Sequence, residues 1–281
     1  MSDSKTREFV MTEADFAQIR KLALDFTGIS LSEHKKEMVY SRLARRLRVL
    51  DMNEFSDYIA YLKTNNADEI SNFMNSITTN LTSFFRENHH FDYLSKTVIP
   101  ELLELHKSDK KIRVWSAGCS TGEEPYSIAM TFLESGKFPS PQWDVKILAT
   151  DLDSNVLSHA KAAVYAENTM SSVPATIKSR WFNQKKQNEK NVYQVADKVR
   201  DLLTFNRLNL MEKWPLNGKF DVIFCRNVVI YFDKPTQKIL FERYADALND
   251  GGHLFIGHSE TLHGVTSRFK PLGRTIYRKT H

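Results

Sequence analysis

The fold of this chain is decided by the segment Val114-Trp115-Ser116-Ala117-Gly118-Cys119-Ser120-Thr121-Gly122-Glu123-Glu124-Pro125-Tyr126-Ser127. An apolar, β-type stretch over 112–115 runs into a loop of small residues, and a helix is expected to begin at Pro125, since proline suits the first helical turn. The two glycines of the loop allow a tight turn and let a ligand approach the backbone closely. A strand, a glycine-rich turn and a helix form the ligand-binding corner of an open α/β sheet.

Two acidic residues, Glu123 and Glu124, stand where this helix starts. The N-terminus of a helix favours negative charge, so the pair is well placed there. The same pair argues against a phosphate in the corner. We therefore expect a ligand that carries positive charge, such as an amino group or a sulfonium.

The composition is that of an ordinary globular protein, with 281 residues, 41% of them hydrophobic and 26% charged. No stretch approaches the roughly 20 apolar residues that span a bilayer, and the polar segment Met1–Glu8 is unlike a secretory signal. The two cysteines, Cys119 and Cys225, indicate reduced thiols of a cytoplasmic protein and not a disulfide. A net charge of +5 fits an acidic partner without requiring nucleic acid.

Residues 1–77 show helical periodicity and no strand pattern, which predicts a small helical bundle. A capping box at Thr12 opens the first helix and Gly28 ends it, while Ser32 is expected to cap the second. The four apolar stripes are Phe16, Ile19, Leu22, Ala23 and Phe26; Val39, Leu43, Leu47 and Leu50; Phe55, Tyr58, Ile59 and Leu62; and Ile70, Phe73, Met74 and Ile77.

After the connecting residues 78–105, strand and helix patterns alternate, which predicts an α/β domain with a mainly parallel sheet covered by helices. Strands are expected at 112–115, 145–150, 202–205, 220–225, 253–256 and 275–278, and helices at 125–134, 154–163 and 235–248. The polar stretch at about 165–201 breaks this alternation. It predicts an insertion with a small antiparallel hairpin.

Three ligand classes compete for the glycine loop. The loop lacks G-x-G-x-x-G, which makes a nicotinamide dinucleotide the weakest. It does match G-x-S-x-G, the nucleophile elbow of serine hydrolases, with Ser120 as the nucleophile. The candidate triad partners are Asp221 and one of His253, His258 and His263. That elbow normally follows several strands of its own sheet, whereas 112–115 is the first strand here.

The third candidate is S-adenosylmethionine. Asp151 ends the second strand, where an acid can accept both ribose hydroxyls. Asn209 and Asn227 follow later strands, and their amides suit an adenine edge or an amino acid end. The carboxyl ends of parallel strands share one edge of a sheet, so we expect these side chains to lie together, although each could singly be a turn residue.

Four blocks of the sequence resemble the chemotaxis receptor glutamate methyltransferases, the CheR family, over nearly the whole chain. They are Asn80–Arg86, Val114–Ser127, Phe224–Phe232 and Gly257–Glu260, and their order and spacing match as well. The resemblance implies an N-terminal helical domain over 1–77 and a linker over 78–105 that contributes to the cofactor site. It implies a doubly wound methyltransferase domain over 106–281, with a small antiparallel β insertion.

The resemblance implies S-adenosyl-L-methionine as the methyl donor, with S-adenosyl-L-homocysteine as the product. The implied acceptors are glutamate side chains on the cytoplasmic domains of membrane chemoreceptors, in chemotaxis adaptation. Cofactor contacts fall by motif match on Asn80, Thr82, Arg86, Glu124, Asp151, Asn209, Leu210, Asn227 and Val228. The family pattern places Arg86 and Tyr231 near the transferred methyl group, as the implied catalytic residues. A cofactor-binding regulator without catalysis is the alternative.

A basic face on the second predicted helix is the candidate receptor-binding surface. Its members, which share one side of the helix, are Lys35, Arg42, Arg45 and Arg46. Such a face could dock along acidic receptor helices, and a solvated charged face is the alternative. A nucleic-acid methyltransferase lacks support, because 226–228 reads Arg-Asn-Val and not Asn/Asp-Pro-Pro-aromatic. We expect a cytoplasmic monomer that binds no nucleic acid and does not insert into the membrane.

In part of the family, the insertion binds a short peptide at the receptor's C-terminus through a glycine-containing loop. Residues 183–191 contain no glycine here, so the resemblance is weakest at this loop. The nine histidines, His89 and His90 included, show no recognised metal-ligand spacing, and no metal is predicted. Glu260 is given no role.

Overall fold

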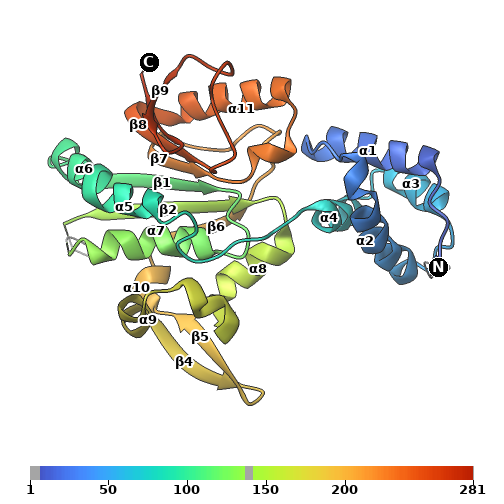
Figure 1. The fold of residues 1–281 in the computed structure, drawn as a ribbon, viewed down its shortest axis with the longest axis horizontal. Coiled ribbons are helices and arrows are strands. Elements are labelled where there is room, and N and C mark those ends of the chain that lie inside the picture. The colour runs from blue at the N-terminus through green and yellow to red at the C-terminus, as the bar shows by residue number, and fades with distance from the viewer. Residues whose placement is uncertain (1–6, 137–141, 281) are drawn as a thin grey trace, which may run out of the picture. The chain divides into compact units, whose positions relative to one another are not determined.

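The computed structural model describes residues 7–136 and 142–280. The chain divides into two compact units (Figure 1). The first consists of Met1–Thr79 with Tyr231–Asp233, and the second consists of Asn80–Ile230 with Lys234–His281.

Helices build the first unit, as its periodicity predicts. They are α1 (Glu13–Thr27), the 3-10 turn η1 (Glu33–Lys35), α2 (Lys36–Val49), α3 (Phe55–Lys63) and α4 (Ala67–Ile77). The capping box at Thr12 and the left-handed Gly28 bound α1, which confirms both predictions. The expectation for Ser32 is wrong: its side chain makes no capping hydrogen bond, because η1 precedes α2. The predicted apolar stripes are buried, except that Phe26, Leu50 and Ile70 are only half-buried.

A seven-stranded mixed sheet organises the second unit, in the order β6-β2-β1-β7-β8-β10-β9. The strands are β6 (Leu203–Arg207), β2 (Asp144–Asp151), β1 (Lys111–Ala117), β7 (Phe220–Cys225), β8 (Leu248–Ile256), β10 (Ile276–Lys279) and β9 (Phe269–Gly273). The first five run parallel to their neighbours, and β10 and β9 form an antiparallel edge. The predicted mainly parallel sheet is confirmed, and β9 is a strand that the sequence patterns missed.

Helices cover both faces of this sheet. They are α5 (His89–Tyr93), the π-helical η2 (Leu94–Val98), α6 (Ile99–Leu105), α7 (Glu123–Glu134), α8 (Ser154–Ala162), α10 (Asp197–Arg200) and α11 (Lys234–Ala247). Val114 of β1 shares a buried cluster with Phe91 of α5 and Ile128 of α7. The next residue, Trp115, faces the other way and lies 5.4 Å from Tyr244 of α11 between ring centroids. Figure 1 shows α7 and α11 on opposite sides of the sheet, as a doubly wound fold requires.

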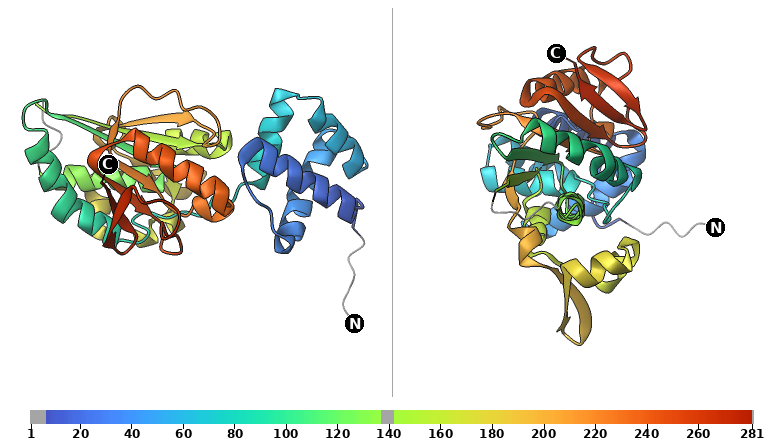
Figure 2. Two further views of the ribbon diagram at one scale, coloured as in Figure 1. Left: turned by 90° about the horizontal axis from the view of Figure 1, so that it is seen from above. Right: turned by 90° about the vertical axis from the view of Figure 1, so that its left-hand side faces the viewer.

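The insertion forms its own three-stranded antiparallel sheet, in the order β3-β5-β4. Its elements are β3 (Val164–Ala166), the 3-10 helix η3 (Glu167–Ser172), α9 (Ala175–Trp181), β4 (Phe182–Gln187) and β5 (Lys190–Val195). The predicted hairpin is β4–β5, which projects away from the larger sheet in Figure 2, and β3 is an addition. Its turn residues Asn188 (φ 47°) and Glu189 (φ 63°) are both left-handed, the geometry of a type I′ turn. The turn is thus made without glycine.

No helix in the described part of the chain is both long enough and apolar enough to cross a membrane.

Candidate active site

The glycine loop follows β1 and is fastened to the end of the neighbouring strand β2. The backbone N–H groups of Gly118 and Cys119 both donate to the carbonyl oxygen of Thr150, at 2.8 and 2.9 Å. Gly118 is left-handed (φ +85°), and a Cβ atom there would lie 2.4 Å from Cγ2 of Val228. The loops after β1 and β7 therefore touch at a point that only glycine allows.

Asp151, the last residue of β2, binds the backbone of the glycine loop through its carboxylate. Its Oδ2 accepts the N–H of Ser120 at 2.8 Å, and its Oδ1 accepts the N–H of Asp153 at 3.0 Å. Burial raises the pKa of Asp151 to about 6, although these backbone hydrogen bonds oppose the rise. The carboxyl is therefore mainly ionised at neutral pH, and its acidity is sensitive to what binds beside it.

Glu124 lies in the first turn of α7, which begins at Glu123, two residues earlier than predicted. Its Oε1 accepts the hydroxyl of Ser116 at 2.7 Å, and its Oε2 lies 3.3 Å from Nη1 of Arg226. Only 11% of the Glu124 side chain and 2% of the Arg226 side chain are exposed. Burial raises the pKa of Glu124, and the Arg226 charge opposes that rise. A buried, largely paired carboxylate thus lies beside the glycine loop.

The segment after α4 crosses the same edge of the sheet. The amide of Asn80 donates to Oδ2 of Asp153 at 2.8 Å, and the carbonyl of Asn80 accepts the hydroxyl of Ser120 at 2.9 Å. Arg86 is half-buried, and its Nη1 donates to the carbonyl of Leu81 at 2.9 Å. Thr82, between these two, is also half-buried.

Glu260, for which no role is expected from sequence patterns, organises the loop after β7. Its buried carboxylate accepts the N–H groups of Asn227 (3.1 Å), Val229 (3.0 Å) and Gly257. Burial raises the pKa of Glu260, and these backbone hydrogen bonds act against that rise. Asn227 is left-handed (φ 58°), so the carboxylate fixes a strained loop that carries two predicted cofactor residues, Asn227 and Val228.

Asn209 and Leu210 follow β6, the outermost parallel strand. The Oδ1 of Asn209 accepts the N–H of Met211 at 3.0 Å, and its Nδ2 donates to Oε1 of Glu212 at 3.1 Å. The side chain of Asn209 therefore stabilises the turn that follows it. This turn lies at the carboxyl edge of the parallel sheet, where the ligand is expected. The carbonyl of Leu210 accepts Nη1 of Arg243 at 2.6 Å, and its side chain is buried.

Tyr231 belongs to the first compact unit. Its carbonyl accepts the N–H of Ser30 at 2.8 Å, and the ammonium of Lys35 lies 4.5 Å from the centre of its ring. Arg86 and the cofactor candidates belong to the second unit.

The basic face of α2 is less uniform than its spacing implies. Arg46 forms a bidentate salt bridge with Glu69, with Nε to Oε1 at 3.0 Å and Nη2 to Oε2 at 2.6 Å. Oε1 of Glu69 also accepts a hydrogen bond from the hydroxyl of Tyr58 at 2.8 Å. Arg42 donates to the carbonyl oxygens of residues 76 and 78, at the end of α4. Arg45 is exposed, whereas Lys35 is half-buried. Lys35 also belongs to the 3-10 turn η1 and not to α2, where the spacing predicts it. Two of the four side chains thus stabilise the bundle itself.

The serine hydrolase alternative finds no support in the geometry. The hydroxyl of Ser120 donates to the carbonyl of Asn80 and not to a histidine. Asp221, the proposed acid, bonds His106 at 3.0 Å and the N–H of Arg113 at 2.8 Å. It lies at the amino end of β7, whereas Ser120 follows the carboxyl end of the parallel strand β1. Acid and nucleophile are therefore at opposite edges of the sheet.

Comparison with known proteins identifies the family to which this architecture belongs. Residues 14–78 match the all-alpha domain of CheR methyltransferase, and residues 80–278 match its SAM binding domain. A probable chemotaxis protein methyltransferase of Rhizobium etli is 45% identical over 90% of this chain and 95% of its own length.

Two further relatives cover nearly the whole chain. Chemotaxis protein methyltransferase 2 of Pseudomonas aeruginosa is 42% identical, over 96% of this chain and 95% of its own length. The chemotaxis protein methyltransferase of Escherichia coli is 38% identical, over 97% and 93%. On these matches to both of its domains, the chain belongs to the CheR family of chemotaxis methyltransferases, whose cofactor is S-adenosylmethionine.

Proposed function

We propose that this protein transfers a methyl group from S-adenosylmethionine to glutamate side chains in the cytoplasmic segments of chemoreceptors, and so forms glutamate methyl esters in chemotaxis adaptation. The observation that carries this proposal is the meeting of the loops after β1 and β7, at Gly118 and Val228. Strand order reverses between β1 and β7, and ligands of open α/β sheets bind at such a point.

The side chains at this edge suit the cofactor. An ionised carboxylate has about four lone-pair sites, and the two backbone N–H groups on Asp151 leave room for both ribose hydroxyls. The carboxylate of Glu124 provides negative charge for the cationic part of the cofactor. Asn80, Thr82, Asn209, Leu210, Asn227 and Val228 complete the proposed cofactor set. The cofactor supplies a methyl group bound to a positively charged sulfur.

The residues around the acceptor need only orient it. A glutamate side chain has an unperturbed pKa of about 4.3, so it is already ionised and needs no general base. Arg86 uses one guanidinium N–H for the carbonyl of Leu81, and its planar fork suits both oxygens of an acceptor carboxylate. Positioning of this kind contributes on the order of 7–11 kcal/mol in well-oriented reactions. On the family match alone, we assign Tyr231 as the second catalytic residue, a hydroxyl donor and aromatic wall.

The receptor-docking surface is proposed to lie on α2, with Arg45 as its exposed charge and Lys35 beside it. Arg42 and Arg46 stabilise the bundle, and their positive charges would also add to the electrostatic potential that attracts an acidic receptor. Such steering needs neither nucleic acid nor membrane insertion, and it suits a cytoplasmic monomer.

Tritium transfer tests this proposal. Purified protein is incubated with methyl-tritiated S-adenosylmethionine and membranes that contain the organism's own chemoreceptors. We expect receptor label that mild base releases as volatile methanol, because carboxyl methyl esters are base-labile. Cofactor binding without any label would favour the regulator alternative, and label that resists base would exclude an ester.

A further inference from the structure

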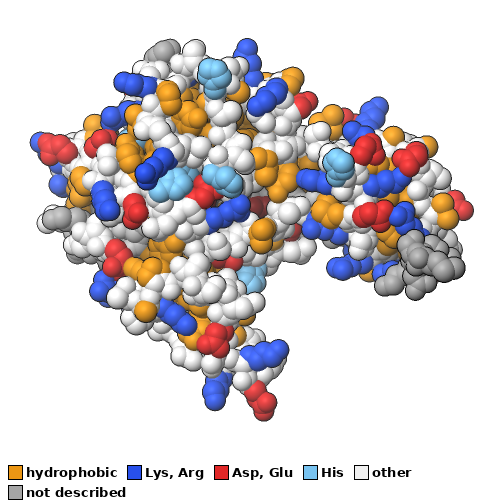
Figure 3. Space-filling view, in the orientation of Figure 1, with side chains coloured by type: hydrophobic (Ala, Val, Ile, Leu, Met, Phe, Trp, Pro, Cys, Tyr) orange, Lys and Arg blue, Asp and Glu red, His pale blue; other side chains and the backbone are white. Residues whose placement is uncertain are grey.

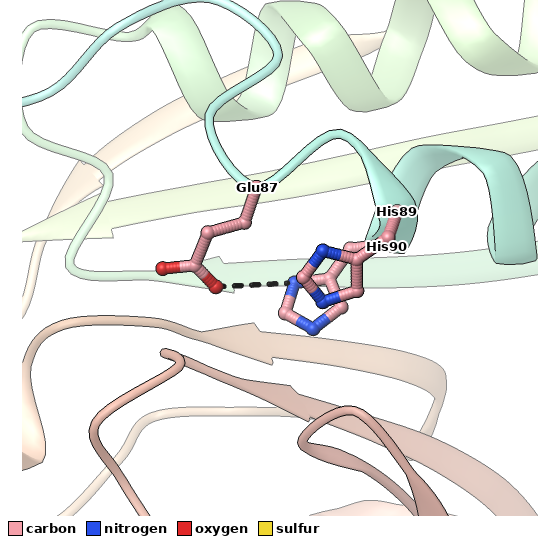
Figure 4. Close-up of side chains that lie close together, drawn as sticks. All are labelled: Glu87, His89 and His90. Atoms are coloured by element: carbon pink, nitrogen blue, oxygen red, sulfur yellow. Dashed lines mark ion pairs between the residues drawn. The ribbon is translucent and has the colours of Figure 1, made fainter.

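A cluster of one carboxylate and two imidazoles lies directly after Arg86, at the start of α5. Its members are Glu87, His89 and His90, and one ligand atom of each lies within 4.8 Å of the others. Figure 4 shows the carboxylate of Glu87 pointing toward the imidazole ring of His90, with the tilted ring of His89 beside it. In Figure 3, histidine and acidic side chains stand side by side on this face of the second unit.

Two buried polar atoms, Oε2 of Glu87 and Nδ1 of His90, face each other without a hydrogen bond. The ring of His90 is fully buried, and its Nε2 lies 3.0 Å from the carbonyl oxygen of Arg274. Nε2 also lies 3.1 Å from the hydroxyl of Thr275, which itself donates to the same carbonyl at 2.7 Å. Both neighbours then accept, so we assign the proton to Nε2, which leaves Nδ1 with a lone pair. Nδ1 faces Oε2 of Glu87 at 3.6 Å, and both atoms are buried without a hydrogen-bond partner. Two buried acceptors that face each other are costly unless a positive group lies between them.

The histidines have the outer hydrogen bonds of metal ligands. Nε2 of His89 lies 3.3 Å from the same Arg274 carbonyl that Nε2 of His90 contacts. Metal-binding histidines usually donate their second ring N–H to a carbonyl or carboxylate, which fixes the ring and frees the other nitrogen.

The surrounding charges also allow a cation. Arg226 lies 3.5 Å from Oε2 of Glu87 and 3.3 Å from Oε2 of Glu124. When both carboxylates are ionised, they outweigh the single guanidinium between them.

We propose that Glu87, His89 and His90 bind a divalent transition-metal cation of the zinc class. Imidazole nitrogens and a carboxylate suit Zn²⁺, whereas Mg²⁺ prefers oxygen ligands and retains its waters. A water completes the coordination, or the exposed ring of His258, whose Nδ1 lies 2.9 Å from Oε1 of Glu87. The spacing of the histidines in the sequence matches no known metal-binding motif, so it predicts no metal. It is the fold that adds the Arg274 carbonyl and turns the carboxylate toward the rings.

Metal titration of the full chain tests this site. Metal-free protein is titrated with zinc chloride against a chromophoric chelator, and one Zn²⁺ per chain is expected, with no competition from magnesium chloride. His89→Ala should weaken zinc binding on the order of tenfold or more. His263→Ala, which removes an exposed histidine from the same unit, should bind as the wild type does.

Cobalt provides the second readout. Co²⁺ added to the wild type should give the visible absorption bands of a nitrogen-ligated ion, and His89→Ala should lose them. If thermal melting shows that His89→Ala is not folded, His89→Gln replaces it, because glutamine retains a polar side chain of similar length. No stoichiometric zinc binding by the wild type, or equal zinc affinity in a folded His89 variant, overturns the proposal.

Discussion

The guanidinium of Arg226 donates a hydrogen bond to the backbone carbonyl of Arg86. Its other arm approaches the carboxylate of Glu124, so one buried side chain joins the proposed catalytic segment to the first turn of α7. The two partners are reached by two separate nitrogens of the planar guanidinium, whereas a lysine would offer its donors from a single nitrogen, so this link favours arginine in particular. The backbone of Arg86 is therefore positioned by a residue that needs no contact with the substrate.

We expect Arg226→Lys to lower the methyl-transfer rate on the order of tenfold or more, since small displacements of a positioning group are costly to catalysis. Initial rates with receptor membranes measure it, and thermal melting checks the fold. Arg113→Lys is the matched control, because Arg113 also bonds backbone carbonyl oxygens but lies near the amino end of β1. An unchanged rate in Arg226→Lys would show that Arg86 does not depend on this link.

The affinity for S-adenosylhomocysteine should depend on pH through Asp151. The pKa of this carboxyl is raised to about 6 by burial, and we assign its ionised form to the ribose hydroxyls. Affinity should therefore be constant above pH 6 and fall as the pH drops below it, approaching about tenfold per pH unit. Isothermal calorimetry between pH 5 and 8 measures this. The drop should be absent in Asp151→Asn, and a flat wild-type profile would refute the assignment.

Asp151 should also affect the stability of the protein without its cofactor. A carboxyl whose pKa is higher in the folded than in the unfolded state binds more protons when folded. Its contribution to stability is thus most favourable below the unfolded pKa of about 4, and it is lost as the pH rises toward 6. Denaturant unfolding at several pH values should show this loss in the wild type and not in Asp151→Asn.

Gly118→Ala should damage the cofactor site beyond the general cost of a left-handed alanine. That backbone cost is on the order of 1 kcal/mol of stability. The added Cβ would also collide with Val228, so cofactor affinity should fall as well. Gly264→Ala separates the two effects, because Gly264 is also left-handed (φ +70°) but has open space around its Cα. Equal cofactor affinity in both variants would contradict the proposed contact of the two loops with the ligand.

The receptor-docking proposal is tested at Arg45 and not at Arg46. Arg45→Glu should slow receptor methylation at low salt and leave cofactor affinity unchanged, since this side chain is exposed. Arg46→Ala would leave Glu69, only 4% exposed, without its partner, and should cost about 3–5 kcal/mol of stability. Reduced methylation in that variant would report unfolding of the bundle. Wild-type methylation by Arg45→Glu at low salt would remove α2 from the docking surface.

The elements that the sequence predicted well are those with strong apolar patterns. Phe220–Cys225 is predicted to the residue, because the apolar run over 222–225, with Phe220 before it, marks a strand buried on both faces. The helical stretch from His89 to Leu105 is not predicted, because the sequence patterns indicate only a connection over 78–105. In the structure, Pro100 lies in the first turn of α6, directly after the π-helical η2.

Only part of the candidate site could be predicted from the sequence, for a different reason. Residues at strand ends, such as Asp151 and Asn227, are placed by the alternation of strands and helices. Glu260 and Arg226 act through partners more than 30 residues away in the chain, and no local pattern reports such contacts. The same holds for Glu87 and its histidines, which acquire the carbonyl of Arg274 only through the fold.

The identity of the methylated atom tests the account most directly. Receptor membranes are incubated with the protein and deuteromethyl S-adenosylmethionine, digested under mildly acidic conditions and sequenced by tandem mass spectrometry. The account predicts the label on glutamate side chains of the cytoplasmic receptor segments, and its absence when Arg86→Ala replaces the wild type. Label on lysine, arginine or any group other than a side-chain carboxylate would contradict it.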